Sequence, residues 1–181
     1  MSLLIFIGAA ALLALERVFY VWVWHRTEAF QSLARQGPLA RIESPVDVLR
    51  LFFYGFKVIQ GAVFLAWWLY FGDGSIGLSD SPSVWLAAAT ALAVGQALNL
   101  AVFWRIGYAG VFYGNRLGHD IPWQTGFPFS VIAHPQYVGT VLTIWGLFLL
   151  VRFPEPDWLV IPVLETLYYA LGARYESDRE A

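Results

Sequence analysis

The stretch from Val84 to Trp104 reads VWLAAATALAVGQALNLAVFW and contains no charged residue. A helix needs roughly 20 predominantly apolar residues, at about 1.5 Å each, to cross the hydrocarbon core of a bilayer. This stretch meets that requirement, and an aromatic residue near each of its ends is typical of anchoring at the membrane interface. The sequence therefore predicts a transmembrane helix here.

Four other segments of comparable apolar character flank this stretch. They run approximately from Leu3 to Trp24, from Leu49 to Phe71, from Tyr137 to Val151 and from Trp158 to Arg174. The last two are separated by Arg152-Phe-Pro-Glu-Pro-Asp157, whose prolines disfavour a continuing helix. We therefore expect an all-α integral membrane protein with about five transmembrane helices and a tight C-terminal helical hairpin, forming a single domain over residues 1–181.

The composition agrees with a membrane location and excludes several kinds of site. Hydrophobic residues make up 59% of the chain and charged residues only 13%, too little charge to cover a water-soluble domain. The net charge of −2 gives no sign of nucleic-acid binding. With no cysteine and 3 histidines, we expect no disulfide, no thiolate nucleophile and no zinc site. The first apolar segment lacks a preceding basic region, so we expect a retained helix, not a cleaved signal peptide.

The distribution of arginine predicts the orientation of the chain in the membrane. The connections after the first and third spans and the C-terminal end carry Arg26, Arg35, Arg41, Arg50, Arg105, Arg116, Arg174 and Arg179. The connection 72–83 carries no arginine, and the hairpin carries only Arg152. By the positive-inside rule, we expect both basic connections and the C-terminus in the cytoplasm and the N-terminus outside.

Residues 107–130 are too polar and too rich in glycine to be a span. Gly107, Gly110 and Gly114 open this segment. Glycine permits positive φ and close approach of the backbone to a ligand, and irregular backbone in a membrane protein is confined to places that line a cavity or meet water. The segment therefore indicates either a ligand-binding loop or an ordinary amphipathic loop.

The motif His134-Pro-Gln-Tyr-Val-Gly139 opens the fourth expected span. Pro135 suits the first helical position, so free backbone N–H groups would point toward the glycine-rich segment and favour a carboxylate there. His134 is a candidate for holding a ligand group or for moving a proton near neutral pH. Its alternative role is structural, as the residue that caps the helix.

Polar residues also occur inside the expected spans. They are Glu16, Arg17, Lys57, Gln60, Gln96, Asn99 and Glu165, with Glu176 at the end of the fifth span. Ionisable groups are costly in a bilayer, so we expect them to face the bundle interior and to mark a functional site. Gln96 and Asn99 are spaced to share one helix face. The structural alternative is a buried pair, Glu16 with Lys57 or Arg17 with Glu165, that fixes the register of two helices.

Five stretches combine into a recognisable pattern: Gly95-Gln-Ala-Leu-Asn99, Gly107-Tyr-Ala-Gly-Val-Phe-Tyr-Gly114, Ile121-Pro-Trp123, Phe127-Pro-Phe129 and His134-Pro-Gln-Tyr-Val-Gly139. Together they resemble the phospholipid N-methyltransferases, which are membrane enzymes that methylate phosphatidylethanolamine, and the plant branch is the most similar. The segment from Glu16 to Arg26 is similar to the first conserved block of this family. More distantly, the His134-Pro-Gln-Tyr137 motif and the hairpin after it resemble isoprenylcysteine carboxyl methyltransferase.

The resemblance implies S-adenosylmethionine as methyl donor and a phospholipid in the membrane as acceptor. It places the donor site over residues 95–139 together with 165–176. The implied donor-binding residues are Gly95, Gln96, Asn99, Gly107, Gly110, Tyr113, Gly114, Phe127, Pro128, Phe129, His134, Pro135, Tyr137, Gly139 and Glu176. On this reading, the donor carboxylate lies at the N-terminus of the fourth span and the donor amine lies near Glu176.

The sequence departs from the animal enzymes of this family in three places. A Gly-x-Gly motif is represented by Ala93-Val94-Gly95, and a pair of glutamates by Glu176-Ser177. The position of His134 is asparagine in the animal enzymes, which argues against His134 as an indispensable base.

Methyl transfer to an amine needs an unprotonated nitrogen aligned with the methyl group, so a group must accept the proton of the ethanolamine ammonium. The candidates are Glu16, His134, Tyr137 and water, and the sequence does not select among them. Two other functions stay open at this point. One is a methyltransferase that acts on a prenylcysteine carboxylate, a thiol or a small amine, and the other is a non-catalytic membrane protein. Nothing in the sequence indicates an oligomeric state.

Overall fold

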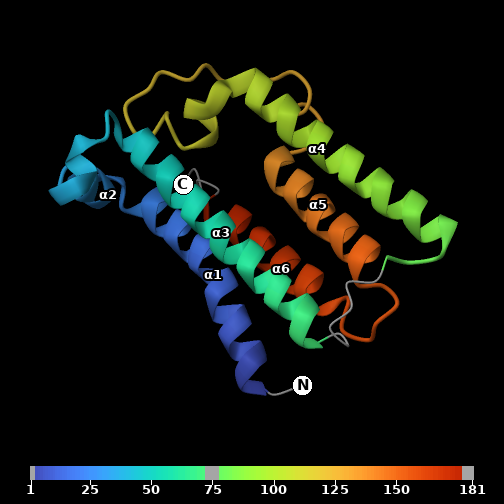
Figure 1. Cartoon of the computed structure of the whole chain (residues 1–181). Helices are drawn as coiled ribbons and strands as arrows, with labels where there is room; N and C mark the ends of the chain where they lie inside the picture. Colours follow the sequence, from blue (N-terminus) through green and yellow to red (C-terminus); the bar gives the residue numbers. More distant parts are fainter. Residues whose placement is uncertain (1–2, 72–77, 177–181) are drawn as a thin grey trace.

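The computed structural model describes residues 3–71 and 78–176, and the regular elements in this part of the chain are all helices (Figure 1). The elements are α1 (Leu3–His25), α2 (Thr27–Ala34), the 3₁₀ helix η1 (Gly37–Arg41), α3 (Pro45–Phe71), α4 (Pro82–Val111), α5 (Pro135–Val151) and α6 (Val160–Glu176). The prediction of an all-α protein is confirmed.

Three of the long helices begin at a proline, in agreement with the preference of proline for the first turn of a helix. These helices are α3, α4 and α5. Before α3, the Ser44 Oγ donates to Asp47 Oδ2 at 2.6 Å and accepts from the Asp47 backbone N–H at 3.2 Å, which satisfies one of the free N–H groups of the first turn.

The helices α1, α3 and α4 are long and apolar enough to cross a membrane by length and composition. Large apolar side chains on their outer faces are exposed, among them Leu4, Val58 and Leu86 at 79%, 72% and 70%. Such faces are stable against lipid tails rather than water. The helices α5 and α6 have 17 residues each. The membrane character of the fold is thus confirmed, whereas the number of five spans stays a prediction.

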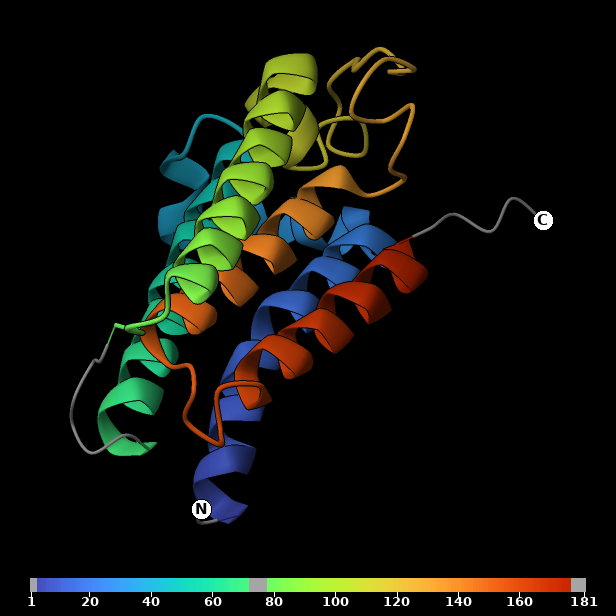
Figure 2. The same ribbon diagram turned by 90° about the vertical axis from the view of Figure 1, so that its right-hand side faces the viewer.

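The long helices alternate in direction, so their connections gather at two ends of the bundle (Figures 1 and 2). One end holds the connections 26–44 and 112–134 and the C-terminus of α6, and the other holds the start of α1 and the hairpin. Sequence expectations for residues 1–2, 72–77 and 177–181, including Ser177 and Arg179, lie outside the described residues. The segments predicted to be cytoplasmic thus lie together at one end of the bundle, and the orientation itself stays a prediction.

The third apolar segment differs from its predicted end at Trp104, because α4 continues to Val111 across a break at Gly107. Gly107 has φ 64° and ψ 178°, a left-handed extended conformation that glycine adopts without steric cost. The predicted hairpin is present between α5 and α6. Its Arg152 donates to Asp157 Oδ1 at 2.7 Å, so this ion pair closes the connection.

Two tryptophans mark the end of the bundle that holds the connections. Trp104 on α4 is 92% exposed and Trp123 in the following connection is 91% exposed. Indole rings in such positions are enriched at membrane interfaces, where one side of the ring meets lipid and the other meets water. At the same end of the bundle, Arg105 Nε donates to the Phe127 carbonyl at 3.0 Å, and this hydrogen bond ties the connection 112–134 to α4.

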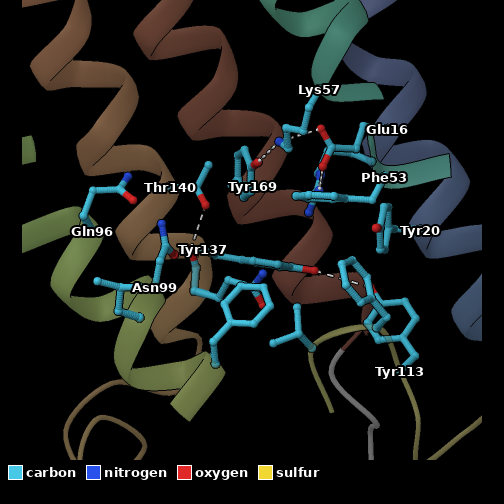
Figure 3. Close-up of a pocket in the computed structure, with 16 residues that line it drawn as sticks. Glu16, Tyr20, Phe53, Lys57, Gln96, Asn99, Tyr113, Tyr137, Thr140 and Tyr169 are labelled. Atoms are coloured by element: carbon cyan, nitrogen blue, oxygen red, sulfur yellow. Dashed lines mark hydrogen bonds and ion pairs between the residues drawn. The ribbon is translucent and has the colours of Figure 1, made fainter. Parts of the chain in front are cut away.

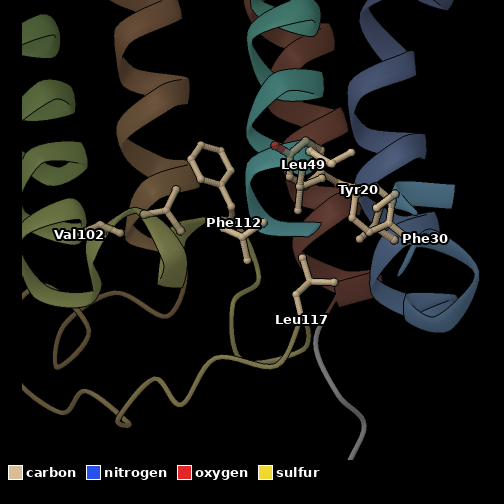
Figure 4. Close-up of a cluster of buried hydrophobic side chains, with 11 residues drawn as sticks. Tyr20, Phe30, Leu49, Val102, Phe112 and Leu117 are labelled. Carbon is tan, nitrogen blue, oxygen red and sulfur yellow. The ribbon is translucent and has the colours of Figure 1, made fainter. Parts of the chain in front are cut away.

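A buried apolar cluster holds this connection against the helices (Figure 4). Its labelled members are Tyr20, Phe30, Leu49, Val102, Phe112 and Leu117. They come from α1, α2, α3, α4 and the segment after α4, so the cluster joins elements that are distant in sequence. It fixes the start of the 112–134 connection beside the C-terminal part of α1 and the N-terminal part of α3.

Glycines allow α4 and α5 to pack with their backbones almost in contact. A Cβ atom on Gly95 would lie 2.6 Å from the Gly139 carbonyl oxygen, and one on Gly139 would lie 2.7 Å from Asn99 Oδ1. A Cβ on Gly146 would lie 2.8 Å from the Leu92 side chain. This close approach through small residues is the usual way in which membrane helices associate. It fixes α5 along the face of α4 that carries Asn99.

Substitution at this contact tests its importance. We expect Gly139→Ala to lower the free energy of unfolding by about 1–3 kcal/mol, because the added methyl group forces the two helices apart. The measurement is thermal unfolding of the purified protein in detergent. The control is Gly61→Ala on α3, where a Cβ would meet nothing within 4 Å. Equal stability of the two variants would contradict the glycine contact.

Candidate functional site

A cavity of about 250 Å³ lies between the helices (Figure 3). Its walls come from α1, α3, α4, α5 and α6 and from the segment just after α4. The lining residues are Glu16, Arg17, Tyr20, Phe53, Lys57, Gln96, Asn99, Leu100, Phe103, Val111, Phe112, Tyr113, Gln136, Tyr137, Thr140 and Tyr169. This volume is slightly below the roughly 300–1,000 Å³ of small-molecule sites, so the cavity has room for the reacting part of a ligand rather than for a whole one.

A charged group forms one wall of the cavity. Glu16 Oε1 accepts a hydrogen bond from Arg17 Nη2 at 2.5 Å, and Glu16 Oε2 accepts one from Lys57 Nζ at 3.0 Å. The predicted Glu16–Lys57 pair between α1 and α3 is therefore confirmed. The alternative pair of Arg17 with Glu165 is wrong, because Arg17 pairs with Glu16 while Glu165 accepts from Gln60 Nε2 at 2.6 Å.

Lys57 joins this group to α6. Besides Glu16, its ammonium donates to Gln60 Oε1 at 3.0 Å and to the Tyr169 hydroxyl at 3.2 Å. An ammonium has three donor hydrogens, and these three acceptors match them. The Lys57 charge is therefore fully satisfied by the protein.

Arg17 is held among aromatic rings but is only partly hydrogen-bonded. Its guanidinium carbon lies 4.3 Å from the ring centre of Tyr169 and 5.1 Å from those of Tyr20 and Tyr137, distances at which a cation is attracted to a ring face. Its Nε and Nη1 are buried without a hydrogen-bond partner among the described residues.

A tyrosine–glutamate pair lies at the side of the cavity near the connections. The Tyr137 hydroxyl, in the first turn of α5, donates a hydrogen bond to Glu176 Oε2 at the end of α6. The Tyr113 hydroxyl lies 3.4 Å from that of Tyr137. Burial raises the pKa of the Tyr113 phenol well above its usual value, and nearby Tyr137 and Glu176 raise this pKa further. Tyr113 therefore stays neutral at physiological pH.

The second oxygen of Glu176 is available to a ligand. Glu176 is buried, and its Oε1 has no hydrogen-bond partner within the described part of the chain. The same holds for Asn99 Oδ1, on the wall formed by α4. Buried acceptors without a donor are rare in folded proteins and indicate a place that a ligand or water completes.

The structure brings together part of the set predicted from sequence. Glu16, Gln96, Asn99, Tyr113 and Tyr137 line the cavity. Gly95 and Gly139 pack α4 against α5 behind that lining, and Pro135 starts α5 there. Gly114 is held against the Ala109 carbonyl, where a Cβ would be only 2.5 Å away, and Gly110 against the side chain of Ile106. These glycines shape the backbone around the cavity.

The other predicted residues lie outside the lining. His134 occupies the N-cap position of α5 without a side-chain cap hydrogen bond, is exposed, and stacks on Tyr137 at 5.8 Å between ring centres. Phe127 is 55% exposed, Pro128 is buried and Phe129 packs against the apolar cluster of Figure 4. The donor-binding and catalytic roles of all these residues stay predictions.

Sequence reasoning missed several lining residues. Arg17 and Lys57 were expected to face the bundle interior but were not assigned a role in the site, and Tyr20 and Tyr169 were not singled out. A signal was available, because Tyr20 is three residues after Arg17 and Tyr169 is four residues after Glu165, so each shares a helix face with a buried charge. The apolar members of the lining had no such signal.

The fold and this cavity define an integral membrane protein with a polar, charged site inside a bundle of apolar helices. Comparison with known proteins then gives the family. Residues 84–178 match the family described as phospholipid methyltransferase, which covers more than half of the chain. The chain belongs to this family, and it is therefore an enzyme of the methyltransferase class.

Curated relatives agree with this assignment. The chain is 32% identical over 126 residues to an Arabidopsis thaliana phosphatidyl-N-methylethanolamine N-methyltransferase, a match that covers 70% of this chain and 68% of the relative. It is 30% identical over 98 residues to the human phosphatidylethanolamine N-methyltransferase, covering 54% of this chain and 48% of the relative. The chain thus spans about half of the human relative. No solved structure matches the chain.

Removal of the central carboxylate tests the charged wall. We expect Glu16→Gln to lower the free energy of unfolding by about 3–5 kcal/mol, because the buried Arg17 and the partly buried Lys57 then both lose their counter-charge. The measurement is unfolding in detergent. The control is Asp47→Asn, whose partner Arg50 has a side chain 40% exposed, and we expect less than about 1 kcal/mol there. A loss at Glu16 no larger than at Asp47 would refute the role of this carboxylate.

Proposed function

We propose that this protein transfers methyl groups from S-adenosylmethionine to the amine of phosphatidylethanolamine, or of its monomethyl or dimethyl form, at the cytoplasmic face of a membrane. The names of its relatives support this acceptor, since the plant protein is a phosphatidyl-N-methylethanolamine methyltransferase and the human one a phosphatidylethanolamine methyltransferase. The predicted orientation supports the cytoplasmic face, because it places the Glu176 end of α6 on the side from which a water-soluble donor arrives.

The observation that carries the proposal is the free carboxylate oxygen of Glu176 beside the cavity. S-adenosylmethionine carries a sulfonium and an ammonium, and both are cations. Glu176 Oε1 is buried without a donor among the described residues, and the ring of Tyr137 lies next to it. A carboxylate and an aromatic face are the groups that bind such cations. The residues therefore fit the donor, with its amine near Glu176 and its carboxylate near the N-terminus of α5.

The donor supplies an electrophilic methyl group, and the residues of this chain position the acceptor amine and receive its proton. Both Glu16 oxygens accept hydrogen bonds from Arg17 and Lys57, so neither is free to take a proton from the amine. His134 is exposed and does not line the cavity. Tyr137 lines the cavity and is hydrogen-bonded to Glu176. We therefore assign proton removal from the acceptor amine to the Tyr137–Glu176 pair: the Tyr137 oxygen takes the proton from nitrogen as the Tyr137 proton passes to Glu176 Oε2.

Transfer of labelled methyl groups tests the activity. The purified protein is incubated in detergent with S-adenosylmethionine labelled in its methyl group and, separately, with phosphatidylethanolamine, its monomethyl form and its dimethyl form. We expect label in the lipid phase, with the preferred acceptor identifying the methylation step. Donor binding without label in any lipid would assign a different acceptor, and the absence of both would make the protein non-catalytic.

Neutralisation of Glu176 tests the donor placement. We expect Glu176→Gln to raise the Kd for S-adenosylmethionine about tenfold, which is the effect of about 1.4 kcal/mol lost from one charged contact. The measurement is a binding titration by calorimetry. The matched control is Glu28→Gln, since Glu28 is an exposed glutamate at the same end of the bundle. An unchanged Kd for Glu176→Gln would show that the donor amine binds elsewhere.

A further inference from the structure

The guanidinium of Arg17 has an unused capacity to bind an anion. Arg17 is 7% exposed and lines the cavity. Only its Nη2 has a hydrogen-bond acceptor, Glu16, whereas Nε and Nη1 are buried and unpartnered among the described residues. Leaving a buried charged donor unpaired costs free energy, so a ligand that accepts from these nitrogens would be favoured.

The neighbouring cation Lys57 has no such free donors, so the capacity to bind an anion belongs to Arg17 and not to every cation in the wall. The ammonium of Lys57 has three acceptors within 3.2 Å. Among the side chains that line the cavity, Glu16 is the acid, and Arg17 and Lys57 are the bases. The lining side chains therefore carry one positive charge in excess, while the carboxylates of Glu165 and Glu176 lie just outside the lining. Arg17 is the lining cation that retains free donors, and an anion bound there would complete its hydrogen bonding.

The cavity also has an opening toward the side of the bundle. Its lining includes Phe53 and Lys57 on α3 and Leu100 and Phe103 on α4. Leu100 is 67% and Phe103 39% exposed, so the α4 rim faces outward as well as inward. Among the described helices, α3 and α4 are not packed extensively against each other. Figure 3 shows the lining side chains lying between α4 on one side and α3 with α1 on the other.

The depth of Arg17 favours a ligand that arrives through this side opening. About 12 Å of helix, at about 1.5 Å per residue, separates Arg17 from the end of α1 at His25. The N-terminus of α5 is nearer to the end of the bundle with the connections, and its positive dipole end favours the carboxylate of a water-soluble ligand there. A lipid headgroup carries its negative charge on a phosphodiester, which arginine recognises well.

We propose that the guanidinium of Arg17 binds the phosphodiester of the acceptor lipid, whose headgroup enters the cavity sideways between α3 and α4. The identity of the lipid rests on the proposed function, and the proposal adds the residue that recognises its anionic part. Arg17, which holds the phosphodiester, and Glu176 both lie beside Tyr137, since a Cβ on Gly172 would lie 3.4 Å from Arg17 Cδ, 3.8 Å from Glu176 Oε1 and 3.9 Å from Tyr137 Cε2. The amine of the same headgroup then lies beside the Tyr137 hydroxyl.

A binding titration that needs no turnover tests this assignment. The probes are dihexanoyl phosphatidylethanolamine and an analogue in which an ether linkage replaces the phosphodiester, with S-adenosylmethionine titrated in parallel. We expect Arg17→Gln to raise the Kd for the phospholipid about 10- to 100-fold, equivalent to about 1.4–2.8 kcal/mol. The Kd values for the neutral analogue and for S-adenosylmethionine should change less than about threefold.

Two further variants separate binding from folding. Arg17→Lys keeps the positive charge opposite Glu16. If Arg17→Gln fails to fold because it loses this buried cation, Arg17→Lys should still fold. We expect Arg17→Lys to have a Kd for the phospholipid between those of the unsubstituted protein and Arg17→Gln. Arg152→Lys is the matched control, because Arg152 is 3% exposed, is paired with Asp157 and does not line the cavity. It should bind the phospholipid as the unsubstituted protein does.

The outcomes distinguish this proposal from the proposed function. Loss of affinity for S-adenosylmethionine instead of the phospholipid would assign Arg17 to the donor carboxylate and overturn the proposal. Equal weakening of the phospholipid and its neutral analogue, or no binding of either by the unsubstituted protein, would also overturn it. If the protein transfers methyl groups but the Arg17 variants bind the phospholipid with unaltered affinity, the proposed function stands and the Arg17 site is overturned. Arg17-dependent phospholipid binding without methyl transfer would sustain the anion site alone.

Discussion

The carboxylate of Glu16 pairs with two cations within a bundle of apolar helices, and the arrangement of the site depends on this contact. Charges in such surroundings are tolerated when they are paired and hydrogen-bonded. Glu16 binds Arg17 next to it on α1 and Lys57 on α3, and Lys57 extends the contact to Tyr169 on α6. The relative positions of three helices are thereby tied to one carboxylate. Apolar side chains cannot fill the space around these charges without breaking their hydrogen bonds, which is consistent with a polar cavity at this place.

The opposite wall of the cavity has a different physical basis. The helices α4 and α5 meet through Gly95 and Gly139, and this contact depends on the absence of side chains rather than on charge. It brings Asn99 and Tyr137 to the same side of the cavity. A charged wall built by α1, α3 and α6 thus faces a closely packed wall built by α4 and α5. The ion pairs fix how α1, α3 and α6 are positioned along one another, and the backbone contact fixes how α4 and α5 are.

The sequence predicted the helical class and most helix positions, because long apolar segments bounded by proline and arginine have few other solutions. It also predicted the contact of Glu16 with Lys57. The extension of α4 past Trp104 was missed, since a glycine that breaks a helix and one that ends it have the same local signal. The place of Tyr20 and Tyr169 in the lining was missed because membership of a cavity depends on how helices from distant parts of the chain meet.

His134 illustrates the limit of motif reasoning within the site. Its place in the motif suggested either a proton carrier or a helix cap, and the structure gives it the N-cap position, without a side-chain cap hydrogen bond, and a stacking contact with Tyr137. A residue can be part of a motif because it orients its neighbour. The neighbour, Tyr137, was predicted from the same motif and does line the cavity.

The exposed indole of Trp104 follows directly after Phe103, which belongs to the rim of the cavity. Tryptophan rings prefer the narrow zone between headgroups and acyl chains, so they set the depth at which a protein rests in its membrane. The height of the opening is therefore coupled to the thickness of the bilayer. In a thinner or thicker membrane, the bundle must tilt or the lipids must deform to keep Trp104 in that zone. The thickness of the bilayer thus determines whether the opening of the cavity lies at the depth of the lipid headgroups.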